Sequence, residues 1–329
     1  MLMDVKFIFF TLFSFLLFSF PVTAQWQQFN YVAMTTPISL VFWEEDAIRA
    51  KSISSAVFRE FDEIEHQMSR YIYESELSFV NRLAANEPVK VSRSLFSVLS
   101  AAMEISRLSQ GAFDITFASV GYLYDFRKHL QPNAEAIQSG MSKLDYHHVQ
   151  LDLNKRTVKF DVEGVMLDLG GIAKGYAVDQ GIRILQNSGV QSAHLSAGGD
   201  MRLLGDKKGA PWIIGIRNPR DKDKQSLIVP LSNTAISTSG DYERFFIDES
   251  GERIHHILSP KTGKPAKGLQ SVSILASNTL TSDGLSTAIF VLGLKDGLAL
   301  VNQLEGVDAI IIDEKGKVHY SAGLMQPNQ

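Results

Sequence analysis

A carboxylate and a hydroxyl stand four residues apart in the segment 281–288, at Asp283 and Thr287. In a helix this spacing places both side chains on one face. A carboxylate oxygen and a hydroxyl oxygen suit a hard divalent cation that keeps water and substrate phosphate oxygens as its other ligands. The alternative is that Ser282 or Asp283 caps the start of a helix. Taken alone, the segment favours capping.

A double glycine follows an apolar stretch in the segment 167–176, which reads LDLGGIAKGY. Glycines let the backbone approach a ligand closely, and the free amide groups at a helix start attract anions. Lys174 would lie in the first helical turn, where the helix dipole disfavours a cation unless a phosphate lies nearby. The spacing is not that of a Walker A loop. A phosphate site and a plain strand-to-helix turn with a solvated lysine fit this segment about equally.

The pair His255-His256 precedes a turn rich in proline and glycine, and a hydroxyl-rich segment, 238–244, comes shortly before it. Successive residues of a strand face opposite sides, so at most one of the two histidines lines a given site. Histidine is the usual proton carrier near neutral pH. By itself the pattern slightly favours a hairpin with a hydrogen-bonded histidine.

A fourth segment, 111–116, reads GAFDIT and follows a long helical pattern. Gly111 is typical of a residue that ends a helix. An aromatic ring, a carboxylate and a hydroxyl follow it within five residues. Taken alone, the segment indicates a terminating glycine followed by a capping aspartate, Asp114.

Hydrophobic periodicity predicts the elements that hold these segments. Helices are expected at 46–66, 75–83, 92–110, 172–187, 283–292 and 295–304, with a short helix within 131–140. Strands are expected at 38–43, 148–151, 157–160, 166–169, 194–197, 201–204, 212–217, 227–231, 235–237, 271–275 and 307–312. Helices and strands are mixed without strict alternation, which predicts an α+β fold.

The composition is that of an ordinary globular protein. Of 329 residues, 45% are hydrophobic, which is enough for a sizeable core. The formal net charge of −4 gives no reason to expect nucleic acid or an anionic membrane as a partner. There are no cysteines, so disulfides, thiolate metal sites and cysteine nucleophiles are excluded. Any metal must be held by oxygen or imidazole.

The N-terminus has the pattern of a secretory signal peptide. Lys6 precedes an apolar run from Phe7 to Phe20, and small residues follow up to Ala24. The run is shorter than the roughly 20 apolar residues that span a bilayer, so we expect cleavage after Ala24 and not a membrane anchor. Residues 1–24 are then a signal peptide and residues 25–329 the mature domain, exported to a bacterial periplasm.

Together and in this order, the segments resemble the ApbE family of FAD:protein FMN transferases. The resemblance covers about residues 34–294. Each matching piece is weak alone, but the ordered set is very specific. The pieces are MSRYIYESELSFVNRL (68–83), GAFDIT (111–116), LDLGGIAKGYAVD (167–179), SAGGD (196–200), WIIGIRNP (212–219), AISTSGDYERFF (235–246), HHILSPKTGKP (255–265) and SDGLSTAIFVLG (282–293).

The resemblance implies an ApbE-like, T-fold-related chain with two lobes, which transfers FMN from FAD to a threonine hydroxyl of a target flavoprotein and releases AMP. It implies Mg²⁺ or another divalent cation, held by the side chains of Asp283 and Thr287 and by the Gly171 carbonyl. His256 and Asp283 match positions close to the chemistry. The positions that match FAD contacts are Met34, Tyr71, Ala112, Phe113, Asp114, Asp168, Lys174, Ile257 and Ser286. The implied acceptors are subunits of the Na⁺-translocating NADH:quinone reductase, Rnf subunits and FMN-binding domains.

Two positions depart from the family pattern. The Met-Gly-Thr opening of the family reads Met34-Thr35-Thr36 here, so the backbone near the flavin has less freedom. The aspartate that precedes the proline of the family's histidine segment is Ser259 here, so this position offers a hydroxyl and no carboxylate. The residue that removes the threonine proton is left open between His256 and Asp283.

Two other functions compete with transfer. A metal-dependent FAD pyrophosphatase would use the same metal site and give FMN and AMP with water as the acceptor. A non-catalytic periplasmic FAD-binding protein would need no metal and would release FAD intact. The presence of Asp283, Thr287 and His256 together argues against the binding protein.

Overall fold

The computed structural model of this chain describes residues 25–325, so the predicted signal peptide lies outside the described residues. An eight-stranded sheet forms the centre, with every neighbouring pair antiparallel. In spatial order its strands are β1 (Gln25–Ala33), β2 (Thr36–Glu44), β6 (Ala193–Ala197), β7 (Asp200–Leu204), β10 (Ala235–Gly240), β15 (Leu269–Ala276), β16 (Asp308–Asp313) and β17 (Val318–Tyr320).

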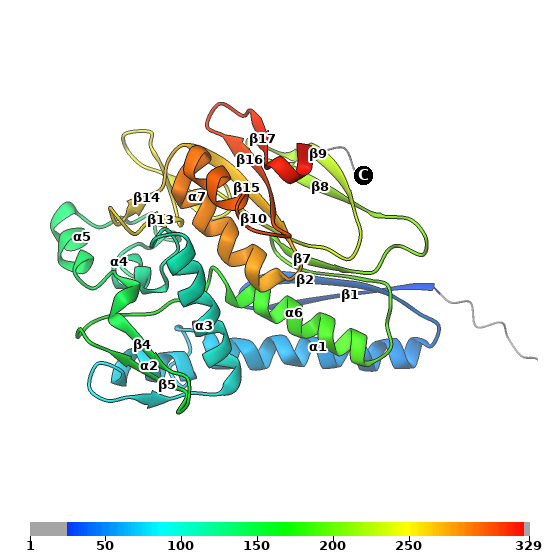
Figure 1. Ribbon diagram of the computed structural model, residues 1–329, viewed down its shortest axis with the longest axis horizontal. Coiled ribbons are helices and arrows are strands. Elements are labelled where there is room, and N and C mark those ends of the chain that lie inside the picture. The colour runs from blue at the N-terminus through cyan, green and yellow to red at the C-terminus, as the bar shows by residue number, and fades with distance from the viewer. Residues whose placement is uncertain (1–24, 326–329) are drawn as a thin grey trace, which may run out of the picture.

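Three long helices pack against this sheet: α1 (Ala47–Met68), α6 (Ala173–Asn187) and α7 (Thr279–Val301) (Figure 1). The hairpin of β8 (Trp212–Asn218) and β9 (Asp221–Leu231) packs on the opposite face, through a small apolar cluster that includes Ile216, Ile236 and Ile310. Strand β15 is buried at every position because it is covered from both sides.

A smaller lobe lies beside the sheet (Figure 1). Its helices are α2 (Glu76–Leu83), α3 (Arg93–Leu108), α4 (Ala118–Gly121) and α5 (Ala134–Met141), with short turns η1 (Ile115–Phe117) and η2 (Tyr146–His148). Its strands are β3 (Val89–Lys90), β4 (Val149–Asp152) and β5 (Thr157–Phe160) in one sheet, and the pairs β11 (Phe245–Ile247) with β12 (Arg253–His255) and β13 (Leu258–Ser259) with β14 (Lys264–Pro265). Helix α8 (Ala322–Met325) ends the described chain. One hydrophobic cluster runs through both lobes, and the predicted α+β, two-lobed fold is confirmed.

Local sequence signals place the main helices. Helix α1 begins where the Asp46 carboxylate accepts hydrogen bonds from two backbone amides, and its buried face carries Val57 and Phe61 at helical spacing. Helix α3 ends at a reversal in which Gln110 and Gly111 have φ of 51° and 79°. Gly111 therefore ends this helix in the left-handed conformation, as predicted.

Helix α7 is long and apolar enough to cross a membrane by length and composition. Here it packs against β10, β15 and α6, as a core helix does (Figure 1). Its backbone breaks at Gly293, where φ is 80°, so the two helices predicted on either side of this residue are consistent with the structure. Its N-terminus is fixed by the Asp179 carboxylate, which accepts hydrogen bonds from the amides of Thr279 and Leu280 at 2.8 Å each.

The strand predicted at 166–169 is wrong. This stretch joins no sheet. In place of a neighbouring strand, its backbone bonds to side chains of the smaller lobe and to the Ile115 carbonyl, which accepts from the Asp168 amide. The amide of Met166 donates to the Ser119 hydroxyl at 3.0 Å, and the Asn81 side chain bonds both the amide and the carbonyl of Leu167. These contacts satisfy an extended, buried backbone without a strand partner.

Candidate active site

Helix α7 brings Asp283 against the start of α6, just after the Gly170-Gly171 turn. The Gly175 amide donates a hydrogen bond of 3.0 Å to Oδ2 of Asp283. A Cβ atom on Gly175 would lie 2.8 Å from the Asp283 Cβ and 2.4 Å from the Thr279 carbonyl oxygen. Only glycine therefore lets the two helices approach this closely, and the two predicted segments do meet.

Three oxygen atoms from these segments could hold a cation. Because Gly175 directs its N–H to Asp283, no backbone amide of the described chain donates to the Gly171 carbonyl. A Cβ on Gly171 would lie 3.4 Å from the Thr287 hydroxyl, so the glycine leaves a cradle beside that oxygen. The Gly175 and Lys174 contacts of Asp283 are both to Oδ2, and Oδ1 accepts no hydrogen bond from residues 25–325.

The donor chemistry of this site fits a hard cation. Within residues 25–325 no three His, Asp or Glu side chains converge, so a metal held here would need carbonyl or hydroxyl oxygens as well. Mg²⁺ accepts such a set because it retains waters and substrate phosphate oxygens. The three predicted ligand residues are brought together in a way that suits this ion.

A buried ion-pair cluster surrounds the same carboxylate. The Lys174 ammonium lies 2.9 Å from Oδ2 of Asp200 and 3.5 Å from Oδ2 of Asp283, and it donates to the Gly170 carbonyl at 3.1 Å. Burial alone would lower the pKa of Lys174, but the two carboxylates outweigh burial and raise it. Burial and then the Asp200 charge raise the pKa of Asp283 to about 7, although Lys174 acts in the opposite direction.

Asp200 was not predicted as a site residue. It opens β7 and is 3% exposed, and it lies in the SAGGD segment, whose aspartate follows a double glycine. A carboxylate at the start of a strand, next to a glycine pair, is the signal that could have identified it.

The two histidines have different surroundings: His255 ends β12, whereas His256 lies just beyond the strand. His255 is buried, and its Nε2 lies 2.9 Å from the Ala266 carbonyl. The Nδ1 atom of His256 is buried and has no hydrogen-bond partner in the described chain. Burial, followed by the charges of Arg244 and His255, lowers the pKa of His256 to about 3, and Lys174 is near enough to add to this effect. His256 is therefore neutral near pH 7 and has a ring nitrogen available.

Asp168 shapes the turn before the double glycine. One carboxylate oxygen accepts the Gly170 amide at 2.7 Å, and the other lies 2.6 Å from Nε of Arg70. The Arg70 guanidinium stacks over the Tyr71 ring at 4.3 Å, and Tyr71 is 78% exposed. The structure thus links two predicted FAD positions, Asp168 and Tyr71, through Arg70, which was not predicted as a site residue.

Met34 lies at the tip of the hairpin between β1 and β2. Met34 and Thr35 have φ of 52° and 56°, so both residues are in the left-handed region. The Met34 amide donates to the Glu65 carboxylate at 2.7 Å, which ties the tip to α1. Thr35 occupies the position at which the family has glycine, and its backbone adopts the conformation that favours glycine.

Several other predicted FAD positions are buried within the protein. Ala112, Phe113 and Ile257 are each at most 5% exposed. The Phe113 ring lies 3.3 Å from the position of a Cβ on Gly171, so it forms a wall of the site. Contact of these residues with FAD stays a prediction.

Asp114 acts as a cap in this structure. One of its carboxylate oxygens accepts the amide and the hydroxyl of Thr116, and the other accepts the Tyr146 amide at 2.8 Å. Burial raises the pKa of Asp114, while the hydrogen bonds from Thr116 lower it. Both carboxylate oxygens have protein partners, in agreement with the prediction that Asp114 is a capping aspartate.

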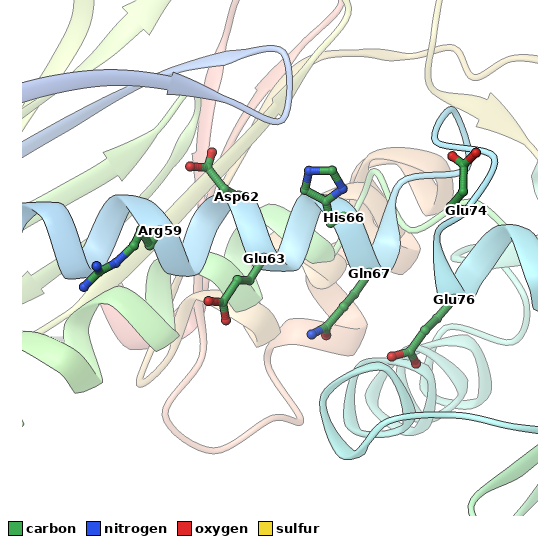
Figure 2. Close-up of a pocket in the computed structure, with 7 residues that line it drawn as sticks. All are labelled: Arg59, Asp62, Glu63, His66, Gln67, Glu74 and Glu76. Atoms are coloured by element: carbon green, nitrogen blue, oxygen red, sulfur yellow. The ribbon is translucent and has the colours of Figure 1, made fainter.

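A separate hollow of about 540 Å³ lies along α1 (Figure 2). Asp62 and Glu63 point to opposite sides of this helix, so the carboxylates do not converge on one point (Figure 2). None of the predicted site residues lines it. The hollow is therefore distinct from the cluster around Asp283.

Comparison with known proteins gives a consistent result. The sequence model of the ApbE family matches residues 34–311. A FAD:protein FMN transferase of Treponema pallidum is 33% identical over 303 residues, which cover 87% of this chain and 83% of that protein. A protein of the same name from Vibrio cholerae is 31% identical over 304 residues, covering 89% and 90%.

Solved structures agree in fold. An ApbE protein of Thermotoga maritima superposes with a TM-score of 0.84 at 33% identity, covering 91% of this chain and 98% of that one. The flavin transferase ApbE of Vibrio cholerae superposes with a TM-score of 0.81 at 28% identity and the same coverage.

Proposed function

This chain belongs to the ApbE family and is a flavin transferase, and we propose that it moves the FMN half of FAD onto a threonine hydroxyl of an acceptor protein. The observation that carries the proposal is the meeting of Asp283 and Thr287 with a Gly171 carbonyl that no backbone amide of residues 25–325 occupies, next to Lys174. His256 is near enough for the Lys174 charge to affect its pKa. This cluster combines oxygen ligands for a cation, a positive charge for phosphate and a neutral imidazole in one place.

The reaction is a phosphoryl transfer in which positioning matters more than covalent chemistry from the enzyme. The threonine oxygen forms a bond to the phosphorus of the FMN half. The bond from that phosphorus to the bridging oxygen breaks, and AMP leaves with this oxygen. The threonine proton passes to a base, so atoms and charge balance.

The residues of the chain divide these tasks. Asp283, Thr287 and Gly171 would hold a divalent cation such as Mg²⁺, which supplies Lewis-acid stabilisation of the diphosphate when bound. Lys174 places a positive charge next to the diphosphate. We assign the proton to His256, whose Nδ1 has no hydrogen-bond partner among residues 25–325 and whose pKa of about 3 the negative charge of a bound diphosphate would raise. A carboxylate committed to a cation is a poor base.

The exposed ring of Tyr71 and the hairpin tip at Met34 would bind the flavin end of FAD. Both are anchored by side chains of the same chain, Arg70 for Tyr71 and Glu65 for Met34. The buried wall formed by Phe113 would exclude water from the diphosphate.

The acceptors we propose are membrane redox subunits, such as those of the Na⁺-translocating NADH:quinone reductase and Rnf complexes, and FMN-binding domains. We also propose that the chain is exported to the periplasm after cleavage behind Ala24. The mass of the protein recovered from the periplasm tests this, since it should begin at Gln25.

The decisive experiment is the intact mass of a candidate acceptor domain after incubation with enzyme, FAD and Mg²⁺. We expect a gain that corresponds to FMN, lost when the acceptor threonine is replaced by alanine. Asp283→Ala should abolish the gain because it removes the only carboxylate of the ligand set. Full flavinylation by Asp283→Ala at limiting Mg²⁺ would contradict the assignment.

A parallel incubation without acceptor separates transfer from hydrolysis. A transferase should release FMN and AMP slowly from FAD alone. Release as fast as the acceptor reaction would instead identify a pyrophosphatase, and intact FAD in every incubation would identify a binding protein.

A further inference from the structure

A row of hydroxyls connects strand β10 to helix α7 beside the proposed cation ligands. The Ser239 hydroxyl lies 2.7 Å from the Ser286 hydroxyl and 3.2 Å from that of Thr287. Two residues earlier on the same strand, Ser237 pairs with Ser282 at 2.8 Å. Alternate residues of a strand face the same side, so Ser237 and Ser239 both face α7.

The proton of each hydroxyl can be assigned by counting. A serine or threonine hydroxyl has one proton to donate and two lone pairs to accept with. Ser286 donates its proton to the Asp283 carbonyl at 2.8 Å. It can then only accept from Ser239, so Ser239 donates to Ser286. Ser239 has then no proton left for its contact with Thr287. In the hydrogen bond between these two hydroxyls, Thr287 is therefore the donor and Ser239 the acceptor.

This order of donors determines which way the Thr287 oxygen faces. Helical threonines often donate to the carbonyl four residues earlier, but Thr287 makes no such bond in the described chain. Its proton points to β10, and its lone pairs are left for the side on which Gly171 leaves its cradle. A cation binds an oxygen through lone pairs and is repelled by a hydroxyl proton that points at it.

We propose that Ser239 is a positioning residue that takes the Thr287 proton and so presents the Thr287 oxygen to the cation. The inference rests on the proposed metal-dependent function and adds a residue to it. Ser239 need not touch the ion or FAD, since it acts through Thr287. Groups that orient a ligand in this way typically change metal affinity about 10–100-fold when they are removed.

Metal binding without turnover is the appropriate measurement. Metal-free full-length mature protein is titrated with Mn²⁺, whose free concentration is read from its electron paramagnetic resonance signal. Ser239→Ala should raise the Mn²⁺ dissociation constant about tenfold, close to the effect of Thr287→Val. Ser239→Thr retains the hydroxyl and should restore affinity to within about threefold of the unaltered protein.

Ser237→Ala is the matched control. It removes a hydroxyl from the same face of the same strand, and the lost partner, Ser282, is likewise on α7. Its dissociation constant should stay within about twofold of the unaltered protein, because Thr287 keeps Ser239. Circular dichroism and the melting temperature establish that each variant is folded.

The outcomes separate this inference from the function it rests on. If the unaltered protein binds Mn²⁺ and Ser239→Ala binds it equally well, the role of Ser239 is refuted while the metal site stands. An equal loss in Ser237→Ala also refutes it, because general loosening of α7 would then explain both. If the unaltered protein binds no Mn²⁺ and flavinylates an acceptor without metal, the proposed metal-dependent function fails as well.

Discussion

At the scale of single residues, the site depends on how charge is shared around one ammonium group. Lys174 lies closer to Asp200 than to Asp283, at 2.9 Å against 3.5 Å. Asp200 thus holds the ammonium partly away from the carboxylate that a cation would need. Both carboxylates are almost fully buried, so these interactions are weakly screened by solvent.

Asp200→Asn should therefore weaken cation binding although residue 200 is not a proposed ligand. Lys174 would be left with Asp283 as its only carboxylate and would compete with the cation for it. We expect the Mg²⁺ concentration for half-maximal activity to rise about tenfold, a change of about 1.4 kcal/mol. Titration of activity with Mg²⁺ at saturating FAD measures this. An unchanged requirement would show that the lysine does not compete.

The residues of the site could be predicted only in part from the sequence. Helical spacing placed Asp283 and Thr287 on one face, but their role as cation ligands came from the family resemblance, since the spacing alone favoured capping. Asp200 and Arg70 were not predicted, because each acts through a partner elsewhere in the chain, Lys174 and Asp168. The glycine pair before Asp200 was the one local signal for it. The free Gly171 carbonyl could be implied only by family resemblance, since it depends on Gly175 turning its amide to another helix.

At the scale of elements, the hairpin between β1 and β2 carries a local conflict. A two-residue hairpin turn with two left-handed residues favours asparagine and glycine, but this chain uses Met34 and Thr35. A β-branched residue in the left-handed region is strained, at a cost of about 1–3 kcal/mol. The turn is retained because the register of both strands and the Glu65 contact determine it.

Thr35→Gly should relieve this strain. Glycine also gives the unfolded chain more freedom, which offsets part of the gain, so we expect a net stabilisation of about 1 kcal/mol. The lost contact is small, because the bond from Arg244 to the Thr35 hydroxyl is exposed and 3.3 Å long. The melting temperature should rise by about 2–4 °C. The neighbouring Thr36→Gly makes the same chemical change in ordinary strand conformation and should lower it. A fall in Thr35→Gly of the same size as in Thr36→Gly would show that the turn is not strained.

Element prediction succeeded where one periodicity governs a long segment. The helix predicted at 46–66 is Ala47–Met68, and the strand at 157–160 is Thr157–Phe160. It failed at 166–169, where an apolar run is buried and extended but bonded to side chains such as Asn81. Periodicity reports burial and direction, and it carries no information on which partner satisfies the backbone.

At the scale of the whole molecule, the proposed ligands join parts of the chain that are far apart in sequence. Gly171 precedes α6, and Asp283 and Thr287 belong to α7, which packs on the central sheet (Figure 1). Around them is a buried cluster in which Asp200 and Asp283 share the single ammonium of Lys174. Without a cation this region holds two buried acidic groups against one basic group. Burial, and then the negative charge of Asp200, raise the pKa of Asp283 to about 7.

A bound cation should therefore stabilise the whole fold, because it binds the folded chain and has no assembled site in the unfolded one. At a Mg²⁺ concentration one hundred times the dissociation constant, the gain is about 2.7 kcal/mol. Differential scanning calorimetry should then show a melting temperature several degrees higher in Mg²⁺ than in EDTA. In Asp283→Ala the two melting temperatures should coincide, since the carboxylate that anchors the ion is missing. An equal shift in that variant would mean that Mg²⁺ stabilises the protein at another place, and the link between this site and the stability of the fold would be lost.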